Sequence, residues 1–496
     1  MSTALLTFSI GPVHAFISQA RRVADLWAGS AVLSQLASFA VEALLRNGGT
    51  MIFPVVDAGK IPEALPNRFV ARIPVAEAAK IASAVTSAVI SEWGGMIDGA
   101  LARLRPLGLD GAAEKSNALQ AIQCAWSWVT ETGDYHADSR HGAEQFAASR
   151  MYRPFSAVTA QGLKCAVCGE RTALPDGNRR NVADAWQRAF DLAEHKGIGA
   201  FFRTGQGRLC LVCATKRLFP LLVGKRQVYE SFPDFQPDDK RPYFAVVTMD
   251  GDRLGAALSG DGNAPGSLAD IQRRLSSALT EFATGLRSTG STDLNVALTR
   301  KGRKPQLVYA GGEDVIFIAD PRDALDAAIA VRGLYADAMR NHQLSPEDHT
   351  LSAAVLFSHT RTPAGTVFRE AERLLKQEAK ERAGRDAVAI SLNKGSGLPA
   401  EVVLKWDDRL LTDLKTITSD VASGGLSSRQ TYMLAEEGRE LLGVLDSKDW
   451  EPWLMSCLSG AEVRDVPAAA SLLAPFFRAR KIDALRIARF IAVETR

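Results

Sequence analysis

The sequence lacks several features that would assign it to a class at once. No run of about 18 apolar residues is present, as a helix that spans a membrane would need. The N-terminus, MSTALLTFSIGPVHAF, lacks the basic start and the long apolar core of a signal peptide. Basic and acidic residues are nearly balanced, 59 against 56, so the chain has no excess of positive charge for coating nucleic acid. We therefore expect a cytoplasmic protein with no membrane contact, in which any RNA contact depends on local patches.

Cysteine is also scarce, with six residues in a chain of 496. Four of them form two CxxC pairs, Cys165 with Cys168 and Cys210 with Cys213. In a chain without a signal peptide, this pattern indicates metal binding rather than disulfides. Each pair lets two thiolates approach one ion from a single turn, and two pairs complete a tetrahedral set. Four thiolates without a histidine favour a closed structural zinc site. The alternative is a set of buried, reduced cysteines with accidental spacing.

The length is enough for roughly three or four domains, and 46% hydrophobic and 23% charged residues are ordinary values for a globular protein. We expect an α+β fold. An N-terminal degenerate palm with a helical insert precedes a zinc-binding module, which contains a short helix at residues 181–195. A catalytic palm and a C-terminal helical domain follow. The expected ranges of these four domains are 1–160, 161–225, 226–400 and 401–496.

The most regular pattern begins at residue 243. Predicted strands and helices follow one another in the order β-α-β-β-α-β, and one more helix and one more strand come after them. This order predicts a ferredoxin-like palm with an appended αβ unit. The expected strands are 243–249, 306–309, 315–318, 350–357 and 386–392, and the expected helices are 267–286, 321–341 and 367–383.

An acidic turn lies between two short apolar runs in the segment QLVYAGGEDVIFIA, residues 306–319. Gly311 and Gly312 favour a tight hairpin turn, because glycine adopts the positive φ that such turns demand. Glu313 and Asp314 follow directly. Two carboxylates beside a backbone without side chains suit a divalent cation that carries a polyphosphate. Taken alone, however, the turn is equally well interpreted as a solvated hairpin tip.

A second acidic segment, Asp250-Gly251-Asp252, ends the first strand of the predicted palm. That strand neighbours the central hairpin in a βαββαβ sheet, so these acids can face Glu313 and Asp314. Four carboxylates so placed repel one another unless cations lie among them. Two Mg²⁺ or Mn²⁺ ions about 4 Å apart would activate an attacking hydroxyl and hold the phosphates of a nucleoside triphosphate. Gly251 would let a phosphate or metal approach the backbone.

This site favours attack of a ribose hydroxyl on an α-phosphate with loss of pyrophosphate. Positioning and charge neutralisation would supply the catalysis, and no protein nucleophile is needed. Lys380 and Arg385, at and just after the end of the last predicted helix of the palm, could hold the triphosphate. The alternative is that both are solvated surface charges.

Several motifs resemble a known family. The Asp250-Gly251-Asp252 segment, the YAGGED turn and the segment ERLLKQEAKERAGRDAVAISL resemble the palm of diguanylate cyclases and related nucleotide polymerases. The opening IGPVHAFISQARRVADLWAGS, the double CxxC and the SLNKGSG that ends the last palm strand are similar to the large subunit of type III CRISPR effector complexes, especially the Cmr type (III-B). This resemblance runs nearly end to end. It implies two palms face to face, a zinc-binding module and a C-terminal helical domain that contacts the small subunits.

The resemblance also implies a function. The second palm of that family converts ATP into cyclic oligoadenylate when a guide RNA captures a target RNA, and some members join AMP to another small metabolite. By position, Asp250 with Glu313 or Asp314 would bind the metals, and Gly311 and Gly312 would admit the nucleotide. Partners would be guide RNA, target RNA and the other subunits of the complex.

The first palm is implied to help bind a second ATP, through residues that include Gly29 and Ser30. The sequence departs from the family in two respects. The usual turn is GGDD, whereas Glu313 is one methylene longer, and we expect metal binding to survive this change. Many members also begin with an HD nuclease domain. None of the seven histidines here is followed by aspartate, so we expect no HD-type DNase activity.

Two other hypotheses remain. One is a catalytically silent scaffold of the guide-RNA complex, and the other is a free-standing cyclic dinucleotide synthase that works without RNA. The four acids favour an enzyme over a scaffold, because a scaffold needs no cluster of like charges.

Overall fold

The computed structural model describes most of the chain. The expected domain boundaries near residues 160 and 225 lie outside the described residues. The described residues are 2–21, 23–56, 61, 65–151, 162–175, 177–202, 207–224, 242–259, 267–286, 305–395, 398–460 and 463–493.

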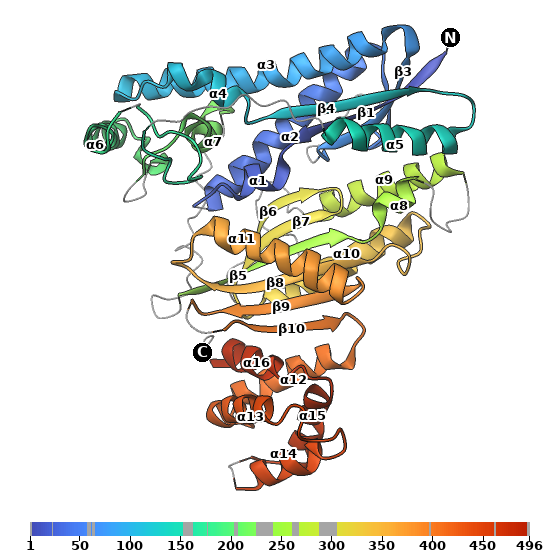
Figure 1. Cartoon of the computed structure of the whole chain (residues 1–496), viewed down its shortest axis with the longest axis vertical. Coiled ribbons are helices and arrows are strands. Elements are labelled where there is room, and N and C mark those ends of the chain that lie inside the picture. The colour runs from blue at the N-terminus through green and yellow to red at the C-terminus, as the bar shows by residue number, and fades with distance from the viewer. Residues whose placement is uncertain are drawn as a thin grey trace.

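The N-terminal unit is built on a four-stranded antiparallel sheet in the order β2-β3-β1-β4. Alternate residues of β1 point to opposite faces, and Ala4, Leu6 and Phe8 enter the core with the long helices α2 and α3. Helix α5 lies against β1 and β4 (Figure 1). The bounds are β1 Thr3–Gly11, α1 Val13–Ser18, α2 Val23–Arg46, β2 Thr50–Phe53, β3 Arg68–Pro74, α3 Ala78–Leu104, α4 Lys115–Leu119, β4 Gln123–Thr130 and α5 Tyr135–Met151, with short 3₁₀ turns at Val75–Glu77, Arg105–Leu107 and Ala112–Glu114.

Helix α2 is long and apolar enough to cross a membrane by length and composition. Its segment Asp25–Arg46 has a mean hydropathy of 1.4, and 61% of the scored window is buried inside the protein. Because its residues Leu26, Val32 and Leu36 lie in the core beside the first sheet, it has the environment of a core helix.

A small module joins the N-terminal unit to the palm. It contains α6 Arg179–His195, a 3₁₀ turn at Gly199–Phe201 and α7 Leu211–Leu222. The helix predicted at 181–195 is confirmed. Helix α7 begins at the second cysteine pair and packs against α2 and α3.

The palm contains a six-stranded sheet in the order β10-β9-β8-β5-β7-β6. The predicted β-α-β-β-α-β order is confirmed, and β9 is added parallel to β8. The bounds are β5 Tyr243–Gly251, α8 Leu254–Ser259, α9 Leu268–Gly285, β6 Gln306–Gly311, β7 Asp314–Ala319, α10 Ala324–Asn341, β8 Leu351–His359, α11 Ala364–Arg373, a π-helix at Leu374–Arg382, β9 Ala387–Asn393 and β10 Ala400–Lys405.

The two faces of the palm sheet belong to different cores. Val247 and Met249 of β5 pack with α9 and α10, whereas Phe244 and Val246 pack on the side of α11. The core on the α11 side continues into the N-terminal unit and the cysteine module. The N-terminal unit, the module and this face of the palm therefore share one apolar core, and α1 lies between them (Figure 1).

The C-terminal part is a bundle of helices below β10 (Figure 1). Residues 401–405, which we expected to be helical, instead complete strand β10, because their alternating pattern pairs with β9 in the palm sheet. The boundary expected at residue 400 therefore falls at the start of this strand. The bundle bounds are α12 Arg409–Ser423, α13 Ser428–Glu440, α14 Trp450–Ser459, α15 Val466–Arg478 and α16 Asp483–Val493.

Candidate active site

The hairpin β6–β7 carries the acidic turn at its tip. Gly312 has φ +69°, a left-handed conformation that glycine adopts without strain. Gly311 has a different reason to be glycine, because a Cβ there would lie 2.1 Å from the hydroxyl oxygen of Tyr309. The nearest atom to a Cβ on Gly312 would belong to Pro66, at 4.0 Å. The turn therefore faces the N-terminal unit. That these two glycines admit a nucleotide stays a prediction.

Strand β5 brings the second acidic segment to this turn. Met249 pairs with Val315 of β7, so the next residues of β5 run past the hairpin tip. A Cβ on Gly251 would lie 2.8 Å from Cβ of Glu313 and 2.3 Å from Leu254. Glycine is thus required here because the strand end presses against Glu313. The predicted juxtaposition of the two acidic segments is present in the structure.

Lys380 lies among these acids. Its ammonium is 2.6 Å from a carboxylate oxygen of Asp250 and donates a hydrogen bond of 2.9 Å to the carbonyl oxygen of Gly251. The side chain is only 14% exposed. Lys380 is therefore not a solvated surface charge. Arg385 makes no ion pair among the described residues, and its backbone, at φ 70°, forms the turn before β9.

Asp252 has a different environment from Asp250. Its carboxylate is buried and accepts hydrogen bonds from the hydroxyls of Thr350 and Ser352, at 2.8 to 2.9 Å, and from the backbone N–H of Asp386, at 3.1 Å. These bonds tie the end of β5 to β8 and β9. The structure thus brings together Asp250, Glu313 and Asp314, called the acid cluster below, while the oxygens of Asp252 are already bonded. A catalytic role for Asp252 stays a prediction.

Burial and mutual repulsion make the ionised forms of the carboxylates in the acid cluster unfavourable. Burial raises the pKa of Glu313, and repulsion from Asp250 adds to this, against the opposing charges of Lys380 and Arg68. Burial, Glu313 and Asp250 hold the pKa of Asp314 well above its usual range. Without a metal, Glu313 and Asp314 therefore hold their protons to higher pH than free carboxyl groups do. A divalent cation would reverse this balance, because its charge favours the ionised form of each oxygen ligand.

A cleft that is open to solvent lies beside the acid cluster. Its floor is formed by β5 and β7, and its walls come from α1 of the N-terminal unit and from the helix that follows β8. Asp250, Asp314 and Glu372 provide its acids, and five of the other nine lining residues are apolar. The lining residues are His14, Ile17, Ser18, Thr248, Met249, Asp250, Asp314, Ile316, Phe368, Glu372, Leu375 and Lys376.

The helix along this cleft changes its winding. We expected one regular helix over 367–383, but α11 ends at Arg373 and a π-helix continues to Arg382. π-Helices are rare in proteins as a whole, but those that occur often lie at functional sites. Glu372, Lys376 and Lys380 follow at four-residue intervals, and all three face the cleft or the acid cluster. That spacing was visible in the sequence and could have added Glu372 and Lys376 to the candidates.

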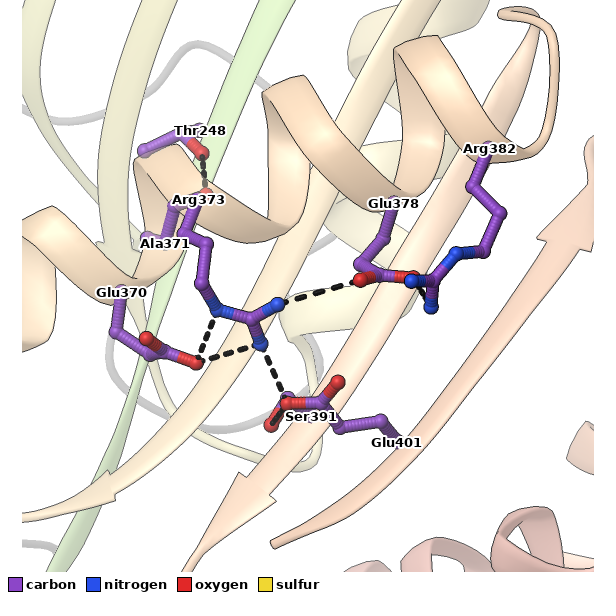
Figure 2. A network of polar contacts seen from close by, with 8 residues as sticks. All are labelled: Thr248, Glu370, Ala371, Arg373, Glu378, Arg382, Ser391 and Glu401. Carbon is purple, nitrogen blue, oxygen red and sulfur yellow. Dashed lines mark hydrogen bonds and ion pairs between the residues drawn. The ribbon is translucent and has the colours of Figure 1, made fainter.

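A network around Arg373 holds the junction between the two helical segments, as Figure 2 shows. Arg373 bonds to Glu370 at 2.7 Å, to Glu401 of β10 at 2.7 Å and to Glu378 at 3.3 Å. Glu378 also pairs with Arg382 at 2.7 Å. The arginine thus fixes the π-helix to the palm sheet, and with it the position of Lys376 and Lys380.

Two further residues near the cluster escaped sequence reasoning. Arg68 starts β3, and its guanidinium lies 4.8 Å from the ring centre of Phe146 while its charge acts on Glu313. The hydroxyl of Tyr335 is buried without a hydrogen-bond partner among the described residues, close to Gly251. Burial raises its pKa, and Glu313 adds to this effect. Arg68 and Tyr335 are far from the acidic turn in sequence, so only the tertiary fold brings them near it.

Gly29 and Ser30 do not line the cleft. Ser30 is buried, and a Cβ on Gly29 would lie 3.1 Å from both Cα of Ile17 and Cε of Lys216. Close packing of α1 and α7 against α2 explains this glycine without a nucleotide. A contact of these residues with a second ATP stays a prediction.

The four cysteines form a compact cluster, as predicted. Their sulfur atoms all lie within 4.8 Å of one another, and those of Cys168 and Cys210 are 3.8 Å apart. The backbone N–H groups of Val167 and Cys213 point at sulfur atoms. Contact with Cys165 is the largest cause that lowers the pKa of Cys168 and raises that of Cys210, because clustered thiols cannot all ionise without a cation. Four sulfur donors in this arrangement fit one tetrahedral zinc ion.

Comparison with known proteins gives related matches for two separate parts of the chain. A model described as the second palm domain of Cas10/Cmr2 matches residues 243–389, and one described as the N-terminal part of the CRISPR-associated protein Cmr2 matches residues 5–98. The CRISPR system Cmr subunit Cmr2 of Pyrococcus furiosus is 28% identical over 180 residues, which are 33% of this chain and 20% of that protein. The match thus spans about a fifth of the length of this curated relative.

Solved structures with the same fold cover nearly the whole chain. A chain of the type III-B Cmr-β complex in its apo state matches with a TM-score of 0.66 at 12% identity, over 94% of this chain and 78% of that one. A chain of a Csm1–Csm4 cassette in complex with AMPPNP matches with a TM-score of 0.56 at 13% identity, over 99% and 70%. At these identities the structures show the fold alone. Residues 5–98 and 243–389 therefore resemble the N-terminal part and the second palm domain of Cas10/Cmr2, and the chain shares the fold of chains from type III-B Cmr and Csm1–Csm4 complexes.

Proposed function

We propose that this chain is an RNA-activated nucleotidyltransferase that converts ATP into a cyclic oligoadenylate or a related AMP conjugate. The observation that carries the proposal is the acid cluster, of which Asp250 and Asp314 line the cleft, with Lys380 bound to Asp250. A nucleotide in this cleft would place its phosphates beside Asp250 and Asp314, where the cations would bind. The apolar part of the lining suits a base, and the acids and lysines suit a triphosphate.

The residues of the acid cluster would bind divalent cations. Asp250, Glu313 and Asp314 offer carboxylate oxygens, the ligands that Mg²⁺ and Mn²⁺ prefer. When bound, the cations would polarise the α-phosphate and lower the pKa of the attacking ribose hydroxyl. Their charge would also release Lys380 from its ion pair with Asp250. The ammonium would then be free to contact the phosphates.

Positively charged residues on two sides would orient the triphosphate. Lys380 projects from the π-helix to Asp250, and Lys376, which pairs with Glu372 at 2.5 Å, lines the cleft. Arg68 lies on the side of the N-terminal unit, opposite Glu313, and could contact the phosphate of a second nucleotide. Lysine binds phosphate as a point charge, whereas arginine adds paired hydrogen bonds. This arrangement provides electrostatic stabilisation without a protein nucleophile.

The proposed setting is a guide-RNA complex in the cytoplasm. The solved relatives support it, because one is a chain of a Cmr-β complex bound to cognate target RNA and others belong to Csm1–Csm4 cassettes in complex with ATP or its oligomers. We propose that the other subunits, guide RNA and target RNA are the partners of this chain as well. The cysteine cluster would hold a structural zinc ion.

Incubation of the assembled complex with labelled ATP, Mg²⁺ or Mn²⁺ and target RNA tests the proposal. A new nucleotide product should form only with target RNA, and the double variant Glu313→Ala, Asp314→Ala should abolish it. No product from the wild-type complex would favour the silent scaffold. Product from the isolated chain without RNA, with GTP as a substrate, would favour the free-standing dinucleotide synthase.

A further inference from the structure

Helix α1 forms a wall of the cleft but cannot be stable alone. It has six residues, and isolated helices of that length do not persist in water. Ile17 and Ser18 in its last turns line the cleft, and a Cβ on Gly365 of α11 would lie 3.2 Å from the carbonyl oxygen of Ser18. The position of α1 relative to the palm therefore depends on what holds its C-terminal end.

A buried lysine holds that end. The ammonium of Lys216, whose residue is 1% exposed, donates hydrogen bonds to the carbonyl oxygens of Phe16, at 2.6 Å, and Gln19, at 2.8 Å. It also lies 4.9 Å from the ring centre of Phe16. The last carbonyl groups of a helix have no partner within it, and a cation there is favoured by the helix dipole. Lys216 thus satisfies groups that α1 cannot satisfy itself.

The lysine reaches α1 from the cysteine cluster. It lies on α7, which begins at Cys210 and contains Cys213, so the position of α7 follows from that of the second cysteine pair. Gly29 of α2 leaves room for this side chain, since a Cβ there would be 3.2 Å from the ammonium nitrogen. A zinc ion held by four thiolates carries net negative charge, which favours a buried ammonium nearby.

The first cysteine pair reaches the same helix end. Glu170 and Arg171 follow the turn that contains Cys168. The side-chain amide of Gln19 donates to Glu170 at 2.7 Å and accepts from Arg171 at 3.0 Å. Residues next to each cysteine pair therefore bond to the C-terminal end of α1: Lys216 to its carbonyl groups, and Glu170 and Arg171 to the side chain of Gln19.

We infer that the zinc-binding cysteine module sets the position of α1, and through it the shape of the nucleotide cleft, with Lys216 as the positioning residue. The inference rests on the proposed function only for the identity of the ligand. By this inference, the affinity for nucleotide depends on zinc, although none of the four clustered cysteines lines the cleft. Removal of zinc or oxidation of the thiols would loosen α1 and weaken nucleotide binding.

The test compares the full-length wild type with Lys216→Met and Lys196→Met. Lys216→Met keeps the apolar stem and removes the ammonium, whereas Lys196 is an exposed lysine of the same module and serves as the matched control. Zinc content, amide hydrogen exchange of residues 16–20 and affinity for AMPPNP with Mg²⁺ are measured for each. We expect Lys216→Met to keep its zinc, to exchange in α1 about tenfold faster and to bind AMPPNP about tenfold more weakly, since two charge-assisted hydrogen bonds are lost. Lys196→Met should match the wild type.

Unchanged exchange in α1 with zinc retained would overturn the inference. Faster exchange with unchanged AMPPNP affinity would overturn it too, because α1 would then not control the cleft. If the wild type itself binds no AMPPNP, the proposed function fails, and hydrogen exchange alone decides whether Lys216 holds α1. Should Lys216→Met not fold, Gln19→Ala removes only the two side-chain bonds and should raise exchange in α1 in the same direction. No change in that variant would contradict the inference.

Discussion

Lys380 and Asp250 form an ion pair of 2.6 Å beside the acid cluster. The side chain of Lys380 is 14% exposed, so this contact is largely protected from solvent. In a metal-free protein the ammonium offsets part of the repulsion among Asp250, Glu313 and Asp314. When cations and ATP bind, the same group becomes available to the triphosphate.

The first prediction distinguishes Lys380 from Arg385, for which the sequence suggested the same role in holding the triphosphate. Lys380→Met should lower kcat/KM for ATP by about 100-fold, because a charge-assisted contact to the phosphates is lost. Arg385→Met removes the same charge from the turn before β9 and should change kcat/KM by less than about threefold. Equal losses in the two variants would contradict the assignment. Steady-state kinetics with the assembled complex provide the measurement.

The second prediction concerns pH. Burial, Glu313 and Asp250 raise the pKa of Asp314 in the folded protein above its unfolded value near 4. Between these two values the folded state binds more protons than the unfolded chain, so the contribution of Asp314 to stability is lost as pH rises through the folded pKa. In metal-free protein at neutral pH, Asp314→Asn should therefore raise the free energy of unfolding by about 1 kcal/mol or more.

Urea unfolding of wild type and Asp314→Asn, between about pH 5 and about pH 8, measures this difference. The gain of the variant over the wild type should grow with pH. Addition of Mg²⁺ should remove it, since a bound cation stabilises the ionised wild-type site. A variant that is less stable than wild type throughout this range would contradict the account.

The third prediction concerns the strand end that presses on the turn. Gly251→Ala would place a methyl group 2.8 Å from Cβ of Glu313 and 2.3 Å from Leu254. We expect it to lower the free energy of unfolding by about 1–3 kcal/mol and to reduce activity by displacing Glu313. Gly255→Ala in α8 is the control, because, beyond the neighbouring backbone of its own helix, no atom of the described residues lies within 4 Å of a Cβ there. Thermal melts and ATP turnover that leave Gly251→Ala like its control would show that the contact is not needed.

The fourth prediction concerns zinc. Metal analysis of the purified chain should find about one zinc per chain, and Cys168→Ser should lose it together with several kcal/mol of stability, because binding and folding of such modules are coupled. Cys457→Ser, at an exposed cysteine outside the cluster, should leave both unchanged. A chain with less than about one zinc and freely titratable thiols would rule out the metal site.

Much of the fold was predictable because its periodicity is local. The strand and helix order of the palm follows from residues close in sequence, and the neighbouring strands β5 and β7 place Asp250 beside Asp314. The compact cluster of four sulfur atoms follows from the spacing of the two CxxC pairs. These features could be predicted because they follow from the local sequence pattern and from the strand order of the βαββαβ sheet.

Other features depend on contacts between distant residues. Nothing near Asp252 indicates that Thr350, Ser352 and Asp386 would bond its oxygens. The π-helix has an ordinary helical sequence, and its junction is held by Glu401 from β10, a strand that sequence reasoning missed. Likewise, the hydrogen bond from Lys216 to the carbonyl oxygen of Phe16 in α1 joins residues 200 positions apart in the sequence.

The central claim is that the acid cluster binds the cations that carry ATP. A structure of the protein with ATP and Mn²⁺, with anomalous scattering to locate manganese, tests it most directly. The account predicts manganese bound to carboxylate oxygens of Asp250, Glu313 or Asp314 at about 2.2 Å, the triphosphate in the cleft, and Lys380 moved from Asp250 to a phosphate oxygen. ATP bound elsewhere, with no manganese at the cluster and the Lys380–Asp250 pair intact, would contradict it.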